Sequence, residues 1–149
     1  MKVISGGQTG ADRTALEVAK ENGVETGGTV PKGWRTELGP DPTLAKFGCV
    51  QHKSAEYPPR TRQNVRDSGG TVWFGKTTSL GFARTKKEAN LADKPFLINP
   101  DSKELMTWLN IWKIQVLNVA GNTQSENPHI GQQVRTFLTP ALARRGVPK

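Results

Sequence analysis

Cysteine is almost absent from this sequence, which has a single one, Cys49, among its 149 residues. One thiol cannot form an internal disulfide, so a small disulfide-stapled domain is excluded. No apolar run approaches the roughly 20 residues of a membrane-spanning helix. The amino terminus, from Met1 to Gly7, also lacks the apolar segment of a signal peptide. We therefore expect a cytoplasmic protein with no membrane partner.

The sequence is equally poor in motifs for metal binding and for nucleophilic catalysis. Cys49 and His52 are its one close pair of soft ligands, whereas a structural zinc site normally has four. A Gly-x-Ser-x-Gly nucleophile elbow is missing as well. Because no convincing general base can be assigned either, we predict no metal site and favour a binding or carrier protein over an enzyme.

Acidic residues are outnumbered, with 13 Asp and Glu against 21 Lys and Arg, a formal net charge of +8. Such an excess favours anionic partners. The basic residues are nevertheless scattered, and the sequence has no zinc-finger, RRM-like or basic-zipper pattern. We therefore expect a small phosphorylated or oxyanionic ligand and not a nucleic acid.

The hydrophobic pattern alternates between short strands and helices over a length suited to one domain. Strands are expected at 3–4, 29–30, 71–74, 96–98 and 114–117, and helices from residue 11, over 61–67 and 80–92, and from residues 102 and 128. Between about 31 and 60 the sequence has no period, which predicts an irregular loop. The pattern predicts a single Rossmann-like α/β domain over 1–149, with three layers and a mainly parallel sheet of about five strands.

A glycine-rich turn stands between the first strand and the first helix. Three glycines, Gly6, Gly7 and Gly10, let the backbone approach a ligand, and the amides of a helix start favour an anion. The glycines alone are equally consistent with a plain turn capped by Thr9 and Asp12. The donors of Gln8 and Arg13 favour binding. On this hypothesis Gly7→Val abolishes binding more than it harms the fold.

The string from Ser5 to Arg13 resembles the opening motif of the putative molybdenum carrier family, a Rossmann-like group related to the lonely-guy phosphoribohydrolases and DNA-processing protein A. The resemblance covers nearly the whole chain. Its further pieces occur in the family's order: Thr26-Gly27-Gly28, Pro31-Lys32-Gly33, Glu37-x-Gly39-Pro40, Tyr57 with Arg60-Thr61, Asn64-Val65-x-Asp67-Ser68, and Leu117 to Gly121.

The resemblance implies a site in which the glycine turn faces a second loop, from Gly75 to Gly81. Lys32, Arg35 and Lys76 would then neutralise an anion, and Asn64 would orient it. In the second loop this chain reads Ser79-Leu80-Gly81-Phe82. Its Phe82 either stacks on a ligand ring or packs at a helix start. The resemblance to the phosphoribohydrolases does not extend to their catalytic Pro-Gly-Gly-x-Gly-Thr-x-x-Glu pattern, which is missing here.

The family implies carriage of molybdenum cofactor, which is a pterin with a terminal phosphate and a molybdenum oxyanion centre, or of a related pterin or molybdate species. A nucleotide derivative presents the same phosphate and a flat ring, so a nucleotide-binding sensor or sequestering protein is the alternative. A nucleotide-processing hydrolase is the third hypothesis. The family also implies a homo-oligomer, for which Trp34, Trp108 or Trp112 could supply an interface.

Overall fold

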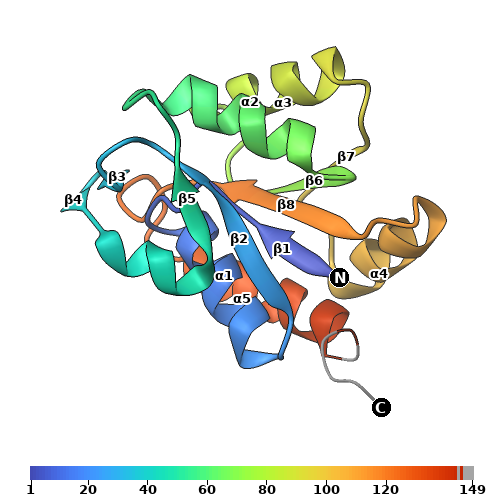
Figure 1. The fold of residues 1–149 in the computed structure, drawn as a ribbon. Coiled ribbons are helices and arrows are strands. Elements are labelled where there is room, and N and C mark those ends of the chain that lie inside the picture. The colour runs from blue at the N-terminus through green and yellow to red at the C-terminus, as the bar shows by residue number, and fades with distance from the viewer. Residues whose placement is uncertain (144, 146–149) are drawn as a thin grey trace.

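Six parallel strands form the central sheet in the computed structural model, which describes residues 1–143 and 145 (Figure 1). The strands, in the order β5-β2-β1-β8-β6-β7, are β5 (Cys49–Gln51), β2 (Glu25–Val30), β1 (Lys2–Ile4), β8 (Val116–Gly121), β6 (Gly70–Phe74) and β7 (Phe96–Ile98). The predicted Rossmann-like α/β class is confirmed. The predicted number of strands is corrected from five to six by β5, which pairs with β2 from Gly28↔Cys49 to Val30↔Gln51.

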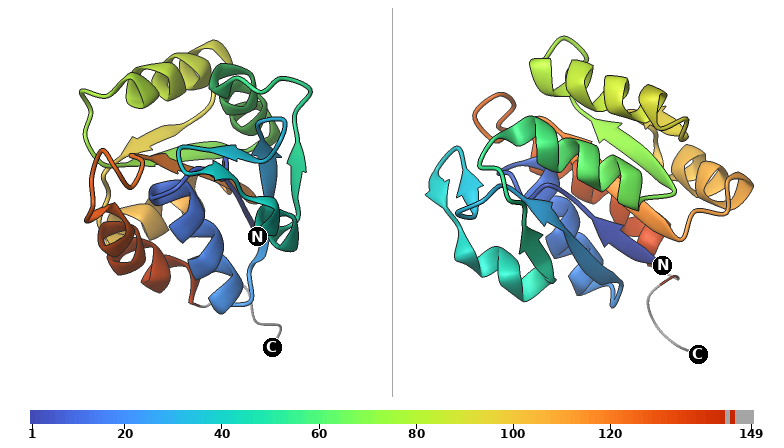
Figure 2. Two further views of the ribbon diagram at one scale, coloured as in Figure 1. Left: turned by 90° about the vertical axis from the view of Figure 1, so that its left-hand side faces the viewer. Right: turned by 45° about the horizontal axis from the view of Figure 1, so that its top comes forward.

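Five α-helices cover the two faces of this sheet and complete the three layers (Figure 2). On one face lie α1 (Ala11–Glu21), α4 (Ser102–Ile111) and α5 (Ile130–Leu142), and on the other lie α2 (Tyr57–Asp67) and α3 (Leu80–Leu91). None of the helices in the described part of the chain is long and apolar enough to cross a membrane.

The main hydrophobic core lies between the sheet and α1, α4 and α5. It takes Val72 and Phe74 from β6, and Leu117 and Val119 from β8, all of them fully buried. Every residue of β6 is buried, as expected for a central strand covered on both faces. This packing fixes the positions at which β1, β6 and β8 end, and those ends carry the candidate site.

The prediction of an irregular loop between residues 31 and 60 is wrong, because this stretch forms a series of short elements. A small antiparallel hairpin of β3 (Arg35–Thr36) and β4 (Gly39–Pro40) is followed by a 3-10 helix, η1 (Pro42–Phe47), and then by β5. Trp34 precedes the hairpin and packs against a second hydrophobic cluster, made of Leu16, Val30, Leu44, Phe47 and Cys49. The stretch is therefore anchored to the domain by a core of its own.

Two boundaries differ from the prediction in ways that affect the site. Strand β8 runs to Gly121 instead of ending at Leu117, so Asn118 lies within the sheet, where its Nδ2 donates to Thr71 Oγ1 at 3.2 Å. Helix α2 begins at Tyr57 and not at Thr61. The earlier start brings a full additional turn of α2, with an aromatic ring and an arginine, to the edge where the central strands end.

Candidate functional site

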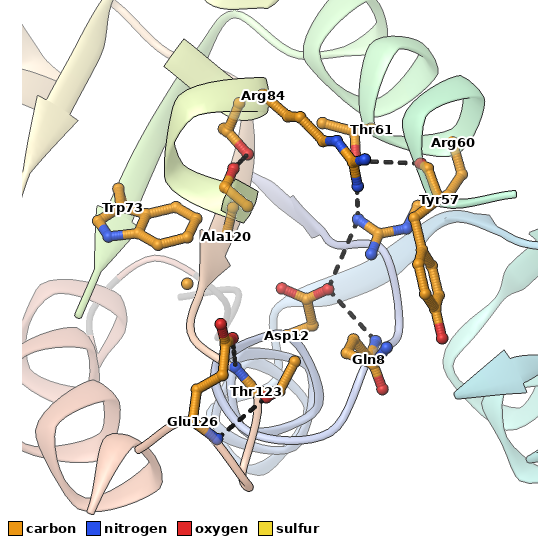
Figure 3. Close-up of a pocket in the computed structure, with 13 residues that line it drawn as sticks. Gln8, Asp12, Tyr57, Arg60, Thr61, Trp73, Arg84, Ala120, Thr123 and Glu126 are labelled. Carbon is orange, nitrogen blue, oxygen red and sulfur yellow. Dashed lines mark hydrogen bonds and ion pairs between the residues drawn. The ribbon is translucent and has the colours of Figure 1, made fainter. Parts of the chain in front are cut away.

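A cavity of about 210 Å³ opens at the carboxyl ends of β1, β6 and β8, between the start of α1 and the pair α2 and α3 (Figure 3). Doubly wound sheets place their ligands at this edge. The 13 lining residues are Gln8, Asp12, Tyr57, Arg60, Thr61, Trp73, Gly81, Arg84, Thr85, Ala120, Gly121, Thr123 and Glu126.

A loosely paired carboxylate and guanidinium occupy the centre of this cavity. Oδ2 of Asp12 lies 4.0 Å from Nη1 of Arg60, and their side chains are only 6% and 14% exposed. The same Oδ2 accepts a hydrogen bond from the backbone N–H of Gln8 at 3.2 Å. At 4.0 Å the two charges attract each other without a direct hydrogen bond.

Burial shifts the pKa values of both groups toward their neutral forms. Burial raises the pKa of Asp12 from its ordinary value of 3.8 to about 6, against the opposing effects of Arg60 and of the backbone N–H groups of Gln8 and Gly6. Burial also lowers the pKa of Arg60, while the charge of Asp12 acts in the opposite direction. A carboxyl group with a pKa near neutrality inside a cleft is a common mark of a functional site.

The guanidinium of Arg60 has more hydrogen-bond donors than its protein partners use. Nη1 donates to Thr61 Oγ1 at 3.0 Å, and the guanidinium carbon lies 5.3 Å from the centre of the Tyr57 ring. Its Nε is buried and has no hydrogen-bond partner among the described residues. A guanidinium carries five N–H donors in a fork that matches an oxyanion. Arg60 therefore retains donors for a ligand.

The glycine turn packs against protein atoms on both sides. A Cβ added at Gly6 would lie 2.4 Å from Nη1 of Arg60, so this glycine gives the guanidinium room beside the backbone. At Gly7, where φ is +72°, a Cβ would lie 2.6 Å from Val30 and 2.9 Å from Leu44. The expectation that Gly7→Val removes a ligand's path is therefore wrong, because the added side chain enters the second hydrophobic cluster.

The sequence also predicted free backbone N–H groups in the glycine turn, but three of these groups already donate to side chains of the protein. The N–H of Gly7 donates to Ser5 Oγ, that of Gln8 to Asp12 Oδ2 and that of Thr9 to Gln8 Oε1. The alternative, in which Thr9 and Asp12 cap the turn, is not met either, since Gly10 is the N-cap of α1 and no side chain caps the helix. The turn shapes the wall of the cavity more than it offers donors.

A network of hydrogen bonds fastens the β3–β4 hairpin over the glycine turn. Oε1 of Gln8 accepts from the backbone N–H of Glu37 at 2.8 Å, and the carboxylate of Glu37 accepts from the hydroxyls of Thr9 and Ser125. Burial opposes ionisation of Glu37, but these hydrogen bonds outweigh it and lower its pKa. The hairpin, the turn and the loop after β8 are thus held together next to the cavity.

Some of the residues predicted from the sequence do meet at the cavity. Gln8, Asp12 and Gly81 line it, and Gly6 and Asn64 line a small hollow next to it that also contains Arg60 and Asp12. The amide of Asn64 is already used, since it donates to Thr29 O and accepts from Thr29 N. Gln8 from the glycine turn and Gly81 from the end of the second loop therefore line the same cavity.

Other predicted residues face a different hollow, on the far side of the turn. Gly7, Thr9, Gly10 and Arg13 line this hollow together with parts of the hairpin. Arg13 donates to Asp41 Oδ2 at 2.6 Å and lies over the ring of Phe47. The structure therefore divides the predicted glycine site between two surfaces.

The remaining five predicted residues line neither the cavity nor either of these two hollows. Lys32 is exposed, Arg35 donates to Ala55 O, Lys76 donates to Glu126 O, and Ser79 caps α3 by accepting from Phe82 N. Phe82 packs edge-to-face on Trp73, with 5.4 Å between the ring centres. Of its two interpretations, packing at the helix start is the one the structure supports.

Sequence reasoning missed most of the cavity's charged and aromatic walls, above all Arg60, Arg84, Trp73 and Glu126. One signal was available, because Arg60 belongs to a motif of the family resemblance. Arg84 carries no such signal. Among the described residues, no group of three or more His, Cys, Asp or Glu side chains is placed to hold a metal ion. Burial raises the pKa of Cys49 to about 12.

Comparison with known proteins identifies the family. Residues 3–142 match the circularly permuted YpsA SLOG family, and the chain belongs to it. A crystal structure of a putative molybdenum carrier protein from Syntrophus aciditrophicus SB has 36% sequence identity, over 92% of this chain and 91% of that one, with a TM-score of 0.82. No curated protein matches the chain. The family resemblance drawn from the sequence is confirmed.

Proposed function

We propose that this member of the circularly permuted YpsA SLOG family binds a small phosphorylated or oxyanionic ligand in the cavity around Arg60, and acts as a carrier. One observation supports this most strongly: a buried guanidinium retains free donors at the strand ends, beside a carboxyl group that is easily neutralised. Arg84 on α3 adds a second cation to the same cavity. Two arginines at one cavity, one of which has a buried Nε with no partner among the described residues, are suited to an anion.

The favoured ligand is molybdenum cofactor, or a related pterin or molybdate species. The similar protein from Syntrophus aciditrophicus carries the name of a putative molybdenum carrier. A volume of about 210 Å³ is below the roughly 300–1,000 Å³ of pockets that enclose a whole drug-sized ligand. The cavity therefore accepts the phosphate or oxyanion end of such a molecule, and its ring system lies further out.

A nucleotide derivative is the alternative ligand, bound by a sensor or sequestering protein. It offers the same phosphate to Arg60 and Arg84. The ring of Tyr57 and the indole of Trp73 stand on opposite sides of Asp12 in the cavity (Figure 3), where a flat base could contact either. Native mass spectrometry of gently purified protein separates the two, because a retained pterin supports the carrier and a retained nucleotide supports the sensor.

A nucleotide-processing hydrolase is a second candidate function, favoured by Asp12. The sequence offered no convincing general base, but a carboxyl group whose pKa is about 6 is well suited to accept a proton near neutral pH. Its test is nucleotide turnover that disappears in a folded Asp12→Asn variant. Nucleotide that is bound but left intact by the wild-type protein contradicts it.

The binding proposal is tested with two variants from one helix. Arg60→Gln removes the cavity's buried guanidinium, and Arg62→Gln removes an exposed one, which pairs with Glu88 at 3.1 Å. Calorimetry with molybdate and with adenosine 5′-monophosphate is expected to show at least tenfold weaker binding in Arg60→Gln and little change in Arg62→Gln. Equal affinity in both folded variants contradicts the proposal.

A further inference from the structure

We infer that Asp12 is a built-in counter-anion for Arg60, which an incoming oxyanion displaces by driving a proton onto the Asp12 carboxylate. The protein would thus take up one proton with each anion and return it to the solvent when the anion leaves. The inference deepens the proposed function and rests on it, since it assumes that the ligand's anionic end occupies the cavity beside Arg60.

The geometry around Asp12 favours protonation of its carboxylate when an anion binds, over a cavity that holds both the anion and an ionised carboxylate. The carboxylate and the guanidinium are 4.0 Å apart, so donors of Arg60 are available to another anion without a direct hydrogen bond being broken. The carboxylate accepts a hydrogen bond of 3.2 Å from the backbone N–H of Gln8, and the backbone N–H of Gly6 also favours its ionised form. A second anion nearby would repel an ionised carboxylate that is almost fully buried, whereas a protonated one gains an O–H that can donate to the ligand.

The surroundings of Asp12 identify it as the group that takes the proton. The charged and titratable side chains that share its cavity or act on it are Arg60 and Tyr57 on α2, Arg84 on α3, Glu126 after β8 and Cys49 on β5. Glu126 instead accepts from the backbone N–H of Thr123 at 3.0 Å and is part of the loop after β8. Burial, and after it the negative charge of Asp12, raise the pKa of Cys49 to about 12 and keep it a neutral thiol.

Linkage gives the size of the effect. With a pKa of about 6 in the free protein, Asp12 is half protonated at about pH 6 and only about 1% protonated at about pH 8. If the anion binds only protein in which Asp12 is protonated, the dissociation constant of the anion rises by about 50-fold from about pH 6 to about pH 8. Near pH 7 the binding of each anion takes up close to one proton.

The test is calorimetric titration with sulfate, a tetrahedral dianion that takes up no proton itself near neutral pH. Repeating the titration in buffers of different ionisation enthalpy gives the number of protons taken up. We expect close to one proton in the wild-type protein near pH 7. In Asp12→Asn, which places an uncharged isostere in the cavity, we expect no uptake and less than a twofold change in affinity between about pH 6 and 8.

Asp41→Asn provides the matched control, because it removes a carboxylate that pairs with Arg13 outside the cavity. It is expected to keep the proton uptake of the wild-type protein. Sulfate binding with no proton uptake in the wild-type protein overturns the inference and leaves the proposed function standing. If neither sulfate nor adenosine 5′-monophosphate binds at about pH 6, the proposed function fails and the inference fails with it.

Discussion

Replacing Asp12 with Asn is predicted to make the protein more stable near pH 7. Asp12 has a pKa of about 6 in the folded chain and an ordinary value of 3.8, so folding favours its protonated form. Because the folded-state pKa of Asp12 lies above its unfolded value, the contribution of Asp12 to the free energy of unfolding is greatest below about pH 4 and is lost as the pH rises through about 6. Over 2.2 pKa units this loss is on the order of 3 kcal/mol at neutral pH.

Asn removes this loss because it cannot ionise. Its Oδ1 can take the place of the oxygen that accepts from Gln8 and faces Arg60, while its Nδ2 forgoes the favourable effect of the Gly6 N–H. That exchange costs roughly 1 kcal/mol. The net gain is about 2 kcal/mol, or a rise of about 4–8 °C in Tm for a chain of this size.

Thermal and urea unfolding at about pH 4, 5.5 and 7 checks this prediction. At pH 4 the exchange cost of roughly 1 kcal/mol is expected to leave Asp12→Asn slightly less stable than the wild type, and the gain is expected to appear and grow as the pH rises to 7. Asp41→Asn is the control and is expected to give no gain, because its carboxylate is partly exposed in an ion pair of 2.6 Å. An Asp12→Asn variant that is less stable than the wild type at pH 7 refutes the reasoning.

Three further predictions concern the neighbouring elements and the ligand. Gly7→Ala is expected to lower the free energy of unfolding by about 1–3 kcal/mol, because φ is +72° and the new Cβ meets Val30 at 2.6 Å; unchanged chemical denaturation contradicts this. Glu37→Gln is expected to speed hydrogen exchange in the hairpin and at Ser125 N, and unchanged exchange there shows that the network does not hold the hairpin. Adenosine 5′-monophosphate is expected to bind severalfold more weakly at physiological than at low ionic strength, and adenosine to bind poorly at both; equal binding of the two with no effect of salt favours a site for an uncharged ring.

Periodicity predicted the layers of the fold because most strands and helices bury one continuous face. It missed β5, which has three residues at the edge of the sheet, with Val50 exposed by 60%. It also started α2 four residues late, because Pro58 and Pro59 resemble a loop. Proline is well tolerated in the first turn of a helix, where its missing N–H has no intrahelical partner.

The candidate site was harder to predict because its two halves lie far apart in the sequence. A turn needs glycine wherever another group comes close to its backbone, and that group can be a ligand or another part of the same protein. Here Gly6 makes room for Arg60, and Gly7 makes room for Val30 and Leu44. Arg60 and Arg84 stand on helices that carry other, exposed basic residues, so only the packing of α2 and α3 over the strand ends sets them apart.

A crystal structure of the protein with molybdate, recorded where molybdenum scatters anomalously, tests the central claim most directly. The account predicts an anomalous peak in the cavity between α1, α2 and α3, with molybdate oxygens within hydrogen-bond distance of Arg60. An anomalous peak beside Arg13 in the hollow on the other side of the glycine turn, with none at Arg60, would contradict it.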